Sequence, residues 1–166
     1  LGAFRQRLAV ALHAEQRERQ LRERATRDSL TGLLNRLGLV EAIDQLAHQG
    51  IPPGLHSAPG FAVVYMDLDG FKEINDAFGH DVGDCVLKEV AARLLRCVGN
   101  TALAMGRPGG DEFVLVLPTD AEGAFRRDIE AVMRAVRQPF VVPSRMLHLA
   151  ASLGMALFPE HGRAHD

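Results

Sequence analysis

Acidic residues form two close pairs in this 166-residue sequence, and each pair adjoins glycine. Asp67 and Asp69 end a continuous apolar run, and Asp111 and Glu112 follow two adjacent glycines. Mg²⁺ prefers oxygen ligands and is usually bound by one or two carboxylates together with substrate phosphates. If the two segments lie on neighbouring strands, their carboxylates can form one two-metal site for nucleotidyl transfer.

Each acidic pair by itself also has a purely structural interpretation. The first pair could end a strand and cap a turn, and the second could be solvated acids beside a hairpin turn. The Asp-x-Asp-Gly order also suggests an EF-hand calcium loop. That loop requires glycine at its sixth position and glutamate at its twelfth, where this sequence has Lys72 and Phe78. The calcium interpretation therefore fails, and the magnesium interpretation depends on the two segments meeting.

The elements around these acids predict an α/β domain that would bring them together. The apolar run over 61–66 is typical of a central strand buried on both faces, and a short helix is expected after Gly70. Apolar runs over 101–106 and 113–117, separated by the Gly-Gly turn, indicate a β-hairpin. Further helices are expected from an Asn35 N-cap to Gly50, over 84–98, and from a Thr119–Glu122 capping box through Val136, with strands near 139–142 and 146–157.

Residues 1–27 differ in composition from the rest of the chain. They carry seven arginines against three glutamates, and Leu1, Phe4, Leu8, Ala11 and Leu12 follow a helical stripe that fades into a charged stretch. This pattern predicts one long helix, with a coiled-coil stalk as one interpretation. A basic helix can also bind nucleic acid, but a solvated helix face is the favoured interpretation, so no nucleic-acid partner is expected.

The overall composition predicts a cytoplasmic protein, or the cytoplasmic part of a larger sensor, with no direct membrane contact. The formal net charge is only -2, and no apolar run approaches the roughly 20 residues that span a bilayer. Cys85 and Cys97 fall on one predicted helix, about 18 Å apart along its axis, which is too far for a disulfide. Buried free thiols are therefore expected, as in a reducing compartment.

Five motifs occur in a fixed order along the chain and carry a resemblance to a known family. They are Asp28-x-Leu30-Thr31-Gly32-Leu33-x-Asn35-Arg36, Asp67-x-Asp69-x-Phe71-Lys72-x-x-Asn75-Asp76, Phe78-Gly79-His80-x-x-Gly83-Asp84, Gly109-Gly110-Asp111-Glu112-Phe113, and Ser152-Leu153-Gly154-x-Ala156 with Pro159. Together they resemble the GGDEF family of diguanylate cyclases. The resemblance covers about 28–162, nearly everything beyond the first helix.

The resemblance implies a fold and a reaction. The fold is an α/β (α+β), adenylyl-cyclase-like palm, with a central, mostly antiparallel sheet flanked by helices, over 28–166, preceded by the helical stalk over 1–27. The reaction condenses two GTP into cyclic di-GMP and two pyrophosphates, with two Mg²⁺ per active site and Mn²⁺ as an alternative cation. Because each protomer would bind one GTP, a transient or stalk-mediated homodimer is expected.

The resemblance also implies roles for individual residues. Asp67, the backbone carbonyl of Leu68, and Asp111 would bind the metal ions. Asp111 would activate the ribose 3′-hydroxyl, with Glu112 and Lys72 assisting catalysis. The substrate-binding residues would be Phe71 and Lys72 at the phosphates, Asn75 and Asp84 at guanine, His80 on the same stretch, and Gly109 and Gly110 at the turn. A helix N-cap is the alternative role for Asp84.

The sequence departs from the family at three places. The family's inhibitory product site, Arg-x-x-Asp, corresponds to Asn100 and Leu103, so product binding is expected only at the active half-site. Pro108 stands where a larger apolar residue is usual. The sequence stops at Asp166, before the family's C-terminal helix, so weaker turnover is expected.

A second interpretation is a catalytically weak module that binds GTP or cyclic di-GMP and regulates a neighbouring domain. A third, an enzyme for another nucleotide, is disfavoured by the pair of Asn75 and Asp84.

Overall fold

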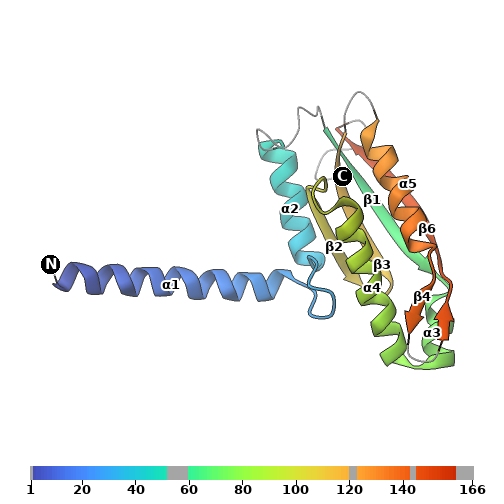
Figure 1. Ribbon diagram of the computed structural model, residues 1–166. Coiled ribbons are helices and arrows are strands. Elements are labelled where there is room, and N and C mark those ends of the chain that lie inside the picture. Colours follow the sequence, from blue (N-terminus) through green and yellow to red (C-terminus); the bar gives the residue numbers. More distant parts are fainter. Residues whose placement is uncertain (1, 52–59, 120–122, 143–144, 160–166) are drawn as a thin grey trace.

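The computed structural model describes residues 2–51, 60–119, 123–142 and 145–159. A long helix extends away from an α/β body (Figure 1). In chain order the elements are α1 (Gly2–Thr26), α2 (Arg36–Gln49), β1 (Gly60–Asp69), α3 (Phe71–Phe78), α4 (His80–Val98), β2 (Ala104–Gly109), β3 (Glu112–Thr119), α5 (Ala124–Val136), β4 (Phe140–Val142), β5 (Arg145–Leu147) and β6 (Ala150–Phe158).

The central sheet is antiparallel and has the strand order β2-β3-β1-β6. β4 and β5 form a separate two-stranded sheet. β1 lies inside the central sheet, with β3 and β6 as its two neighbours. The predicted burial on both faces is confirmed only in part: Ala62, Val64 and Met66 are buried on one face, whereas on the other Tyr65 is 42% exposed. The cluster with α2 on that second face includes Phe61 and Val63 but not Tyr65. The predicted α+β class, with an antiparallel sheet flanked by helices, is confirmed.

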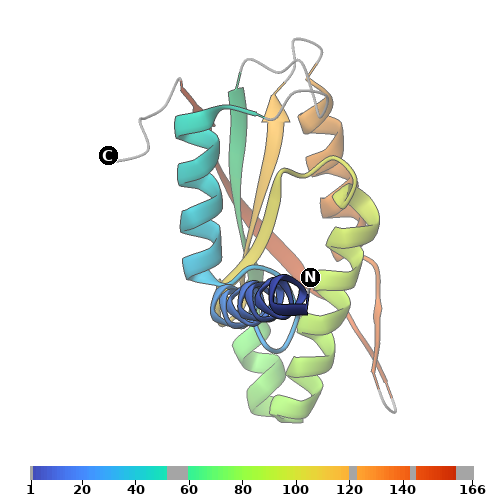
Figure 2. The same ribbon diagram turned by 90° about the vertical axis from the view of Figure 1, so that its left-hand side faces the viewer.

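Helices pack on both faces of this sheet, because successive side chains of a strand point to opposite faces. Ala62, Val64 and Met66 belong to the main core, with side chains from α3, α4 and α5. Phe61 belongs to a smaller cluster with Leu46 of α2. Figure 2 shows the strands between α2 on one side and α4 and α5 on the other.

Local signals explain where several elements begin and end. The Asn35 side chain accepts a hydrogen bond from the Gly38 N–H, which confirms the predicted N-cap of α2. Gly70 joins β1 to α3 with φ of 77°, a left-handed conformation that glycine adopts without steric cost. This sharp turn places the start of α3 directly after the acidic end of β1.

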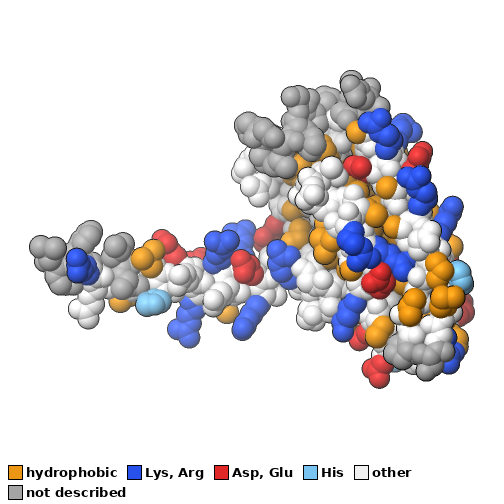
Figure 3. Space-filling model, in the orientation of Figure 1, with side chains coloured by type: hydrophobic (Ala, Val, Ile, Leu, Met, Phe, Trp, Pro, Cys, Tyr) orange, Lys and Arg blue, Asp and Glu red, His pale blue; other side chains and the backbone are white. Residues whose placement is uncertain are grey.

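Residues 2–26 form one continuous helix, as predicted. Leu1 and the side chains of Phe4 and Leu8 lie outside the described set, so the structure does not test that part of the apolar stripe. Val10, Leu12 and Leu21 are exposed, and arginine side chains project along the helix (Figure 3). In the described part of the chain, no helix is both long and apolar enough to cross a membrane.

Several predicted boundaries are wrong. Thr119 is the last residue of β3, and α5 begins at Ala124 after Gly123, so Thr119 caps no helix; Glu122 lies outside the described residues. The single strand expected over 146–157 is two strands, β5 and β6. Both cysteines are free, as expected, but Cys85 is exposed and Cys97 half-buried, so neither is a buried thiol.

Candidate active site

The two acidic segments meet at one end of the central sheet. Asp67 is paired directly with Glu112 in the register of β1 and β3. The Leu68 N–H donates a hydrogen bond to the Asp111 carbonyl oxygen at 3.3 Å. On the other side of β1, the Ser152 hydroxyl of β6 donates to Asp69 Oδ1 at 2.8 Å. The strand register therefore gathers four acidic residues from β1 and the β2–β3 turn.

Electrostatic repulsion is concentrated on Asp67. Desolvation raises the pKa of this carboxyl, and the negative charges of Asp111, Glu112 and Asp69 raise it further. Nearby carboxylates that cannot all ionise without cost favour a compensating cation. The acidic segments therefore form a centre of unneutralised negative charge at the surface.

Tyr65 is part of this centre and was missed in the sequence. It lies two residues before Asp67, so both side chains point to the same face of β1, and 42% of Tyr65 is exposed. The pKa of Tyr65 is raised to about 12, mainly by a hydrogen bond to Glu112 and then by burial and by the charges of Glu112 and Asp67. The Arg36 charge lowers this pKa by a smaller amount. The period-two spacing from Asp67 was the signal that could have indicated it.

The oxygen donors at this centre fit a hard divalent cation. Within residues 2–51, 60–119, 123–142 and 145–159, no three His, Cys, Asp or Glu side chains form a group that could hold a metal by themselves. Mg²⁺ is usually bound by one or two carboxylates and completes its octahedron with water and phosphate oxygens. Asp67, Asp111 and the Leu68 carbonyl have this chemistry, and the repulsion on Asp67 is of the kind that a cation relieves.

The start of α3 lies next to the acidic centre. The Phe71 side chain is buried in the main core, at 7% exposure, so only its backbone remains available to a ligand. Lys72 is exposed on the first turn of α3. The first backbone N–H groups of a helix have no partner within the helix and favour anions. This turn can therefore offer backbone donors and one positive charge to a phosphate.

Asn75 and Asp84 come from two helices in contact. The Asn75 Oδ1 is buried and has no hydrogen-bond partner among the described residues. A Cβ at Gly83 would overlap this oxygen, so glycine is needed for the close approach of α3 and α4. Asp84 follows Gly83 and is half-buried. Because α4 begins at His80, Asp84 lies inside the helix, and its alternative role as N-cap is wrong. His80 is exposed at the start of α4.

Arg107 connects the Gly-Gly turn to Asp28. Its Nη1 lies 3.1 Å from both Asp28 carboxylate oxygens, and its Nε and Nη2 donate to the Gly110 carbonyl at 2.9 and 2.7 Å. Burial would raise the pKa of Asp28, but hydrogen bonds from Thr31 and the Arg107 charge lower it overall. No local pattern indicates this contact, because its partners are 79 residues apart in the sequence.

Comparison with known proteins agrees with this arrangement. The family profile "Diguanylate cyclase, GGDEF domain" matches residues 25–166. The chain belongs to the GGDEF domain family. The earlier resemblance is thus confirmed over nearly all of the chain that follows α1.

This GGDEF domain is similar to parts of longer signalling proteins. It is 35% identical over 145 residues to the cyclic di-GMP phosphodiesterase PdeR of Escherichia coli, covering 87% of this chain and 21% of PdeR. It is 37% identical over 145 residues to the bifunctional diguanylate cyclase/cyclic di-GMP phosphodiesterase MucR of Pseudomonas aeruginosa, covering 87% of this chain and 20% of MucR. The chain thus spans about a fifth of the length of these relatives.

A solved structure resembles both the GGDEF domain and α1. The coiled coil and GGDEF domain of DgcB from Caulobacter crescentus, in complex with c-di-GMP, superimposes with a TM-score of 0.75 at 27% identity. The match covers 96% of this chain and 85% of the DgcB chain. The likeness therefore extends into the N-terminal helix.

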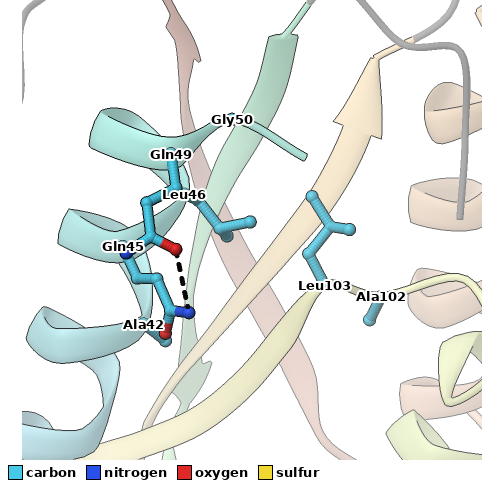
Figure 4. Close-up of a pocket in the computed structure, with 7 residues that line it drawn as sticks. All are labelled: Ala42, Gln45, Leu46, Gln49, Gly50, Ala102 and Leu103. Carbon is cyan, nitrogen blue, oxygen red and sulfur yellow. Dashed lines mark hydrogen bonds between the residues drawn. The ribbon is translucent and has the colours of Figure 1, made fainter. Parts of the chain in front are cut away.

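An uncharged pocket lies at the other end of β2 from the Gly-Gly turn. It has a volume of about 230 Å³. Figure 4 shows it between the last turns of α2 and the segment before β2. The residues that line it are Ala42, Gln45, Leu46, Gln49, Gly50, Ala102 and Leu103. Leu103 is one of the two positions where the family's inhibitory site would have a charged residue, so this GGDEF domain has an apolar side chain there.

Proposed function

We propose that this GGDEF domain is a diguanylate cyclase that condenses two GTP into cyclic di-GMP and two pyrophosphates. One observation carries the proposal: the register that pairs Asp67 with Glu112, and the bond from Leu68 to the Asp111 carbonyl, bring both acidic segments together. The nearby start of α3 and the contact between Asn75 and Gly83 add surfaces for phosphate and base.

GTP would lie between the acidic centre and the α3–α4 pair. The N–H groups of the first turn of α3 and the Lys72 ammonium would bind phosphate oxygens. The Gly109–Gly110 turn has no side chains to obstruct the substrate. Asp84 would accept hydrogen bonds from the guanine N1–H and amino group, which adenine does not offer in that arrangement, and Asn75 and His80 would complete the pocket. Recognition of this polar kind discriminates strongly between bases.

In the reaction, the 3′-oxygen of one GTP would attack the α-phosphorus of the other, and the bond to pyrophosphate would break. Asp111 would accept the 3′-hydroxyl proton, and Glu112, oriented by Tyr65, would support the site. Asp67, the Leu68 carbonyl and Asp111 would bind two Mg²⁺, or Mn²⁺. The cations supply charge stabilisation for the attacking oxygen and the phosphates. A second identical step closes the ring.

Two domains must face each other, because each would bind one GTP. The exposed helix α1 can bring them together as a parallel coiled coil or set their relative angle. We expect removal of residues 1–27 to weaken dimerisation and lower activity at limiting protein concentration, measured by analytical ultracentrifugation and product formation. Unchanged values for both would exclude this role for α1. A cytoplasmic location, where GTP is available, follows from the same proposal.

A regulatory module is the second candidate, because PdeR and MucR contain a similar domain within much longer chains. Such a module would bind GTP or cyclic di-GMP, at the active half-site, without turnover. The retention of Asp67, Asp111 and Glu112 favours the enzyme.

The deciding experiment incubates the protein with GTP and Mg²⁺ and measures cyclic di-GMP. The wild type and Glu130→Ala, which removes an exposed acid of α5, should form product at equal rates. Asp111→Ala should be slower by roughly 10³-fold or more, since a metal ligand and proton acceptor is lost. Product from both the wild type and Asp111→Ala, or from neither, would remove the catalytic assignment of Asp111.

A binding measurement tests the metal assignment without turnover. Mg²⁺ or Mn²⁺ added with a non-hydrolysable GTP analogue should raise Tm by a few degrees, as any ligand specific for the folded state does. The same addition to Asp67→Asn should have little effect. An equal rise in both proteins would exclude Asp67 as a metal ligand.

A further inference from the structure

The Gly109–Gly110 turn is not fixed by side-chain packing. A Cβ built on either glycine has no atom within 4 Å, and Gly110 adopts a left-handed φ of 56°. Glycine also loses more conformational freedom on folding than any other residue. Something outside the turn must therefore hold it, because it carries Asp111 toward β1.

Hydrogen bonds to two consecutive carbonyl groups hold the turn. The Leu68 N–H donates to the Asp111 carbonyl at 3.3 Å. Arg107 donates twice to the neighbouring Gly110 carbonyl, at 2.9 and 2.7 Å. Besides the strand pairing at Glu112, these bonds attach the turn to β1 and to Arg107.

Arg107 is itself fixed at the base of α1. Its side chain is only 12% exposed and forms an ion pair with Asp28, whose side chain is 17% exposed. The Arg107 N–H donates to the Leu34 carbonyl at 2.7 Å, and the Leu34 N–H donates to the Met105 carbonyl at 3.1 Å. A continuous set of bonds therefore joins the segment after α1 to the turn that carries Asp111.

We propose that Arg107 is a positioning residue, which uses its ion pair with Asp28 to fix the Gly110 carbonyl and thereby the place of Asp111 opposite Asp67. A buried ion pair is weak evidence for stability but is well suited to fixing one geometry. A planar guanidinium can bond two groups at fixed angles, which lysine cannot do. Misplacement of a reacting group by about 1 Å can cost roughly 100-fold in rate.

Arg107→Gln tests the proposal, with Arg96→Gln as its matched control. Arg96 also forms an ion pair but is 62% exposed and lies on α4, away from the turn. Amide hydrogen exchange of Leu68 should become at least about tenfold faster in Arg107→Gln and stay unchanged in Arg96→Gln, because the Leu68 N–H bond depends on the position of the turn. If Arg107→Gln does not fold, Asp28→Asn removes the same ion pair with less change in shape.

Catalysis provides the second readout, and it rests on the proposed function. Cyclic di-GMP formation should fall about 10- to 100-fold in Arg107→Gln, with the affinity for a non-hydrolysable GTP analogue changed by less than about threefold. Equal losses of kcat and analogue affinity would overturn the proposal, as would unchanged exchange at Leu68. If the wild type forms no cyclic di-GMP while exchange at Leu68 still rises, the proposed function fails and the positioning role stands.

Discussion

Arg93 and Asp67 are two charged residues with opposite surroundings. Arg93, on α4, is 8% exposed, and its guanidinium donates to Glu89, at 2.9 Å, and to the carbonyls of Ala135, Gln138 and Pro139. It also lies 3.9 Å from the ring centre of Phe140. Burial raises the pKa of Asp67, and the like charges around it raise this pKa further.

The difference indicates what each region contributes. Around Arg93 the charge is compensated, and the contacts join α4 to the end of α5 and the start of β4. At the end of β1 the charges repel, so this end of the sheet is less stable than neutral side chains would make it. Residues that reduce stability in this way are typical of functional sites. The comparison predicts that substitutions at the two residues have opposite effects on activity and stability.

Asp67→Asn should have the largest effect on activity. Loss of a metal-binding carboxylate removes several kcal/mol of transition-state stabilisation, so product formation should fall by roughly 10³-fold or more. Without metal, Tm should rise, because one of four mutually repelling charges is gone. Activity and calorimetry in the presence of a chelator measure the two effects, with Glu130→Gln as a control that changes neither. A lower Tm for Asp67→Asn would mean that the side chain stabilises the fold.

Arg93→Met should have the largest effect on stability. The substitution keeps an apolar stem but removes the guanidinium donors of three carbonyl groups and one of the two arginine donors to Glu89, so the free energy of unfolding should fall by about 3 kcal/mol. Urea denaturation measures this loss, and cyclic di-GMP formation per folded molecule should be unchanged.

Arg96→Met is the matched control, since Arg96 binds the same Glu89 oxygen at 2.9 Å but is 62% exposed. Its loss should cost less than about 1 kcal/mol. Similar costs for the two variants would show that the carbonyl contacts of Arg93 add nothing to stability.

The sequence predicted the parts of the fold that depend on local patterns. The apolar run of β1, the hairpin around Gly109–Gly110 and the Asn35 N-cap were all confirmed. These features depend on neighbours in the sequence or on side-chain burial, which residue types report directly. The order of the motifs also indicated the family. The family in turn predicted an antiparallel sheet, with the acids of β1 and those of the hairpin at the same end.

Contacts between distant segments could not be predicted. Arg93 reads as an ordinary charged residue of α4, yet its carbonyl partners are 42 to 46 residues away. Asp28 belongs to the first motif, whereas Arg107 lies just before the Gly-Gly motif and outside all five, and only the folded chain brings the two within 3.1 Å. The capping box at Thr119 failed because β3 continues through that residue, so sheet pairing prevailed over a local capping signal.

The smallest expected effect is on the pH dependence of stability, which should differ between the surroundings of Asp67 and those of Arg93. The pKa of Asp67 lies above the ordinary aspartate value of 3.8, so its repulsion is complete at neutral pH, weakens as pH falls through the raised pKa, and is absent below 3.8. Hydrogen bonding to Arg93 is the main cause that lowers the pKa of Glu89 below the ordinary value of 4.5. Its stabilisation is therefore complete above pH 4.5 and is lost as pH falls through the lowered pKa.

In metal-free buffer at about pH 7, Asp67→Asn should melt above the wild type and Glu89→Gln below it, by about 1–3 °C each. Both differences should shrink toward acid pH, with the Asp67→Asn difference shrinking first. If both variants deviated in the same direction at neutral pH, the contrast between repelling and compensated charge would be wrong.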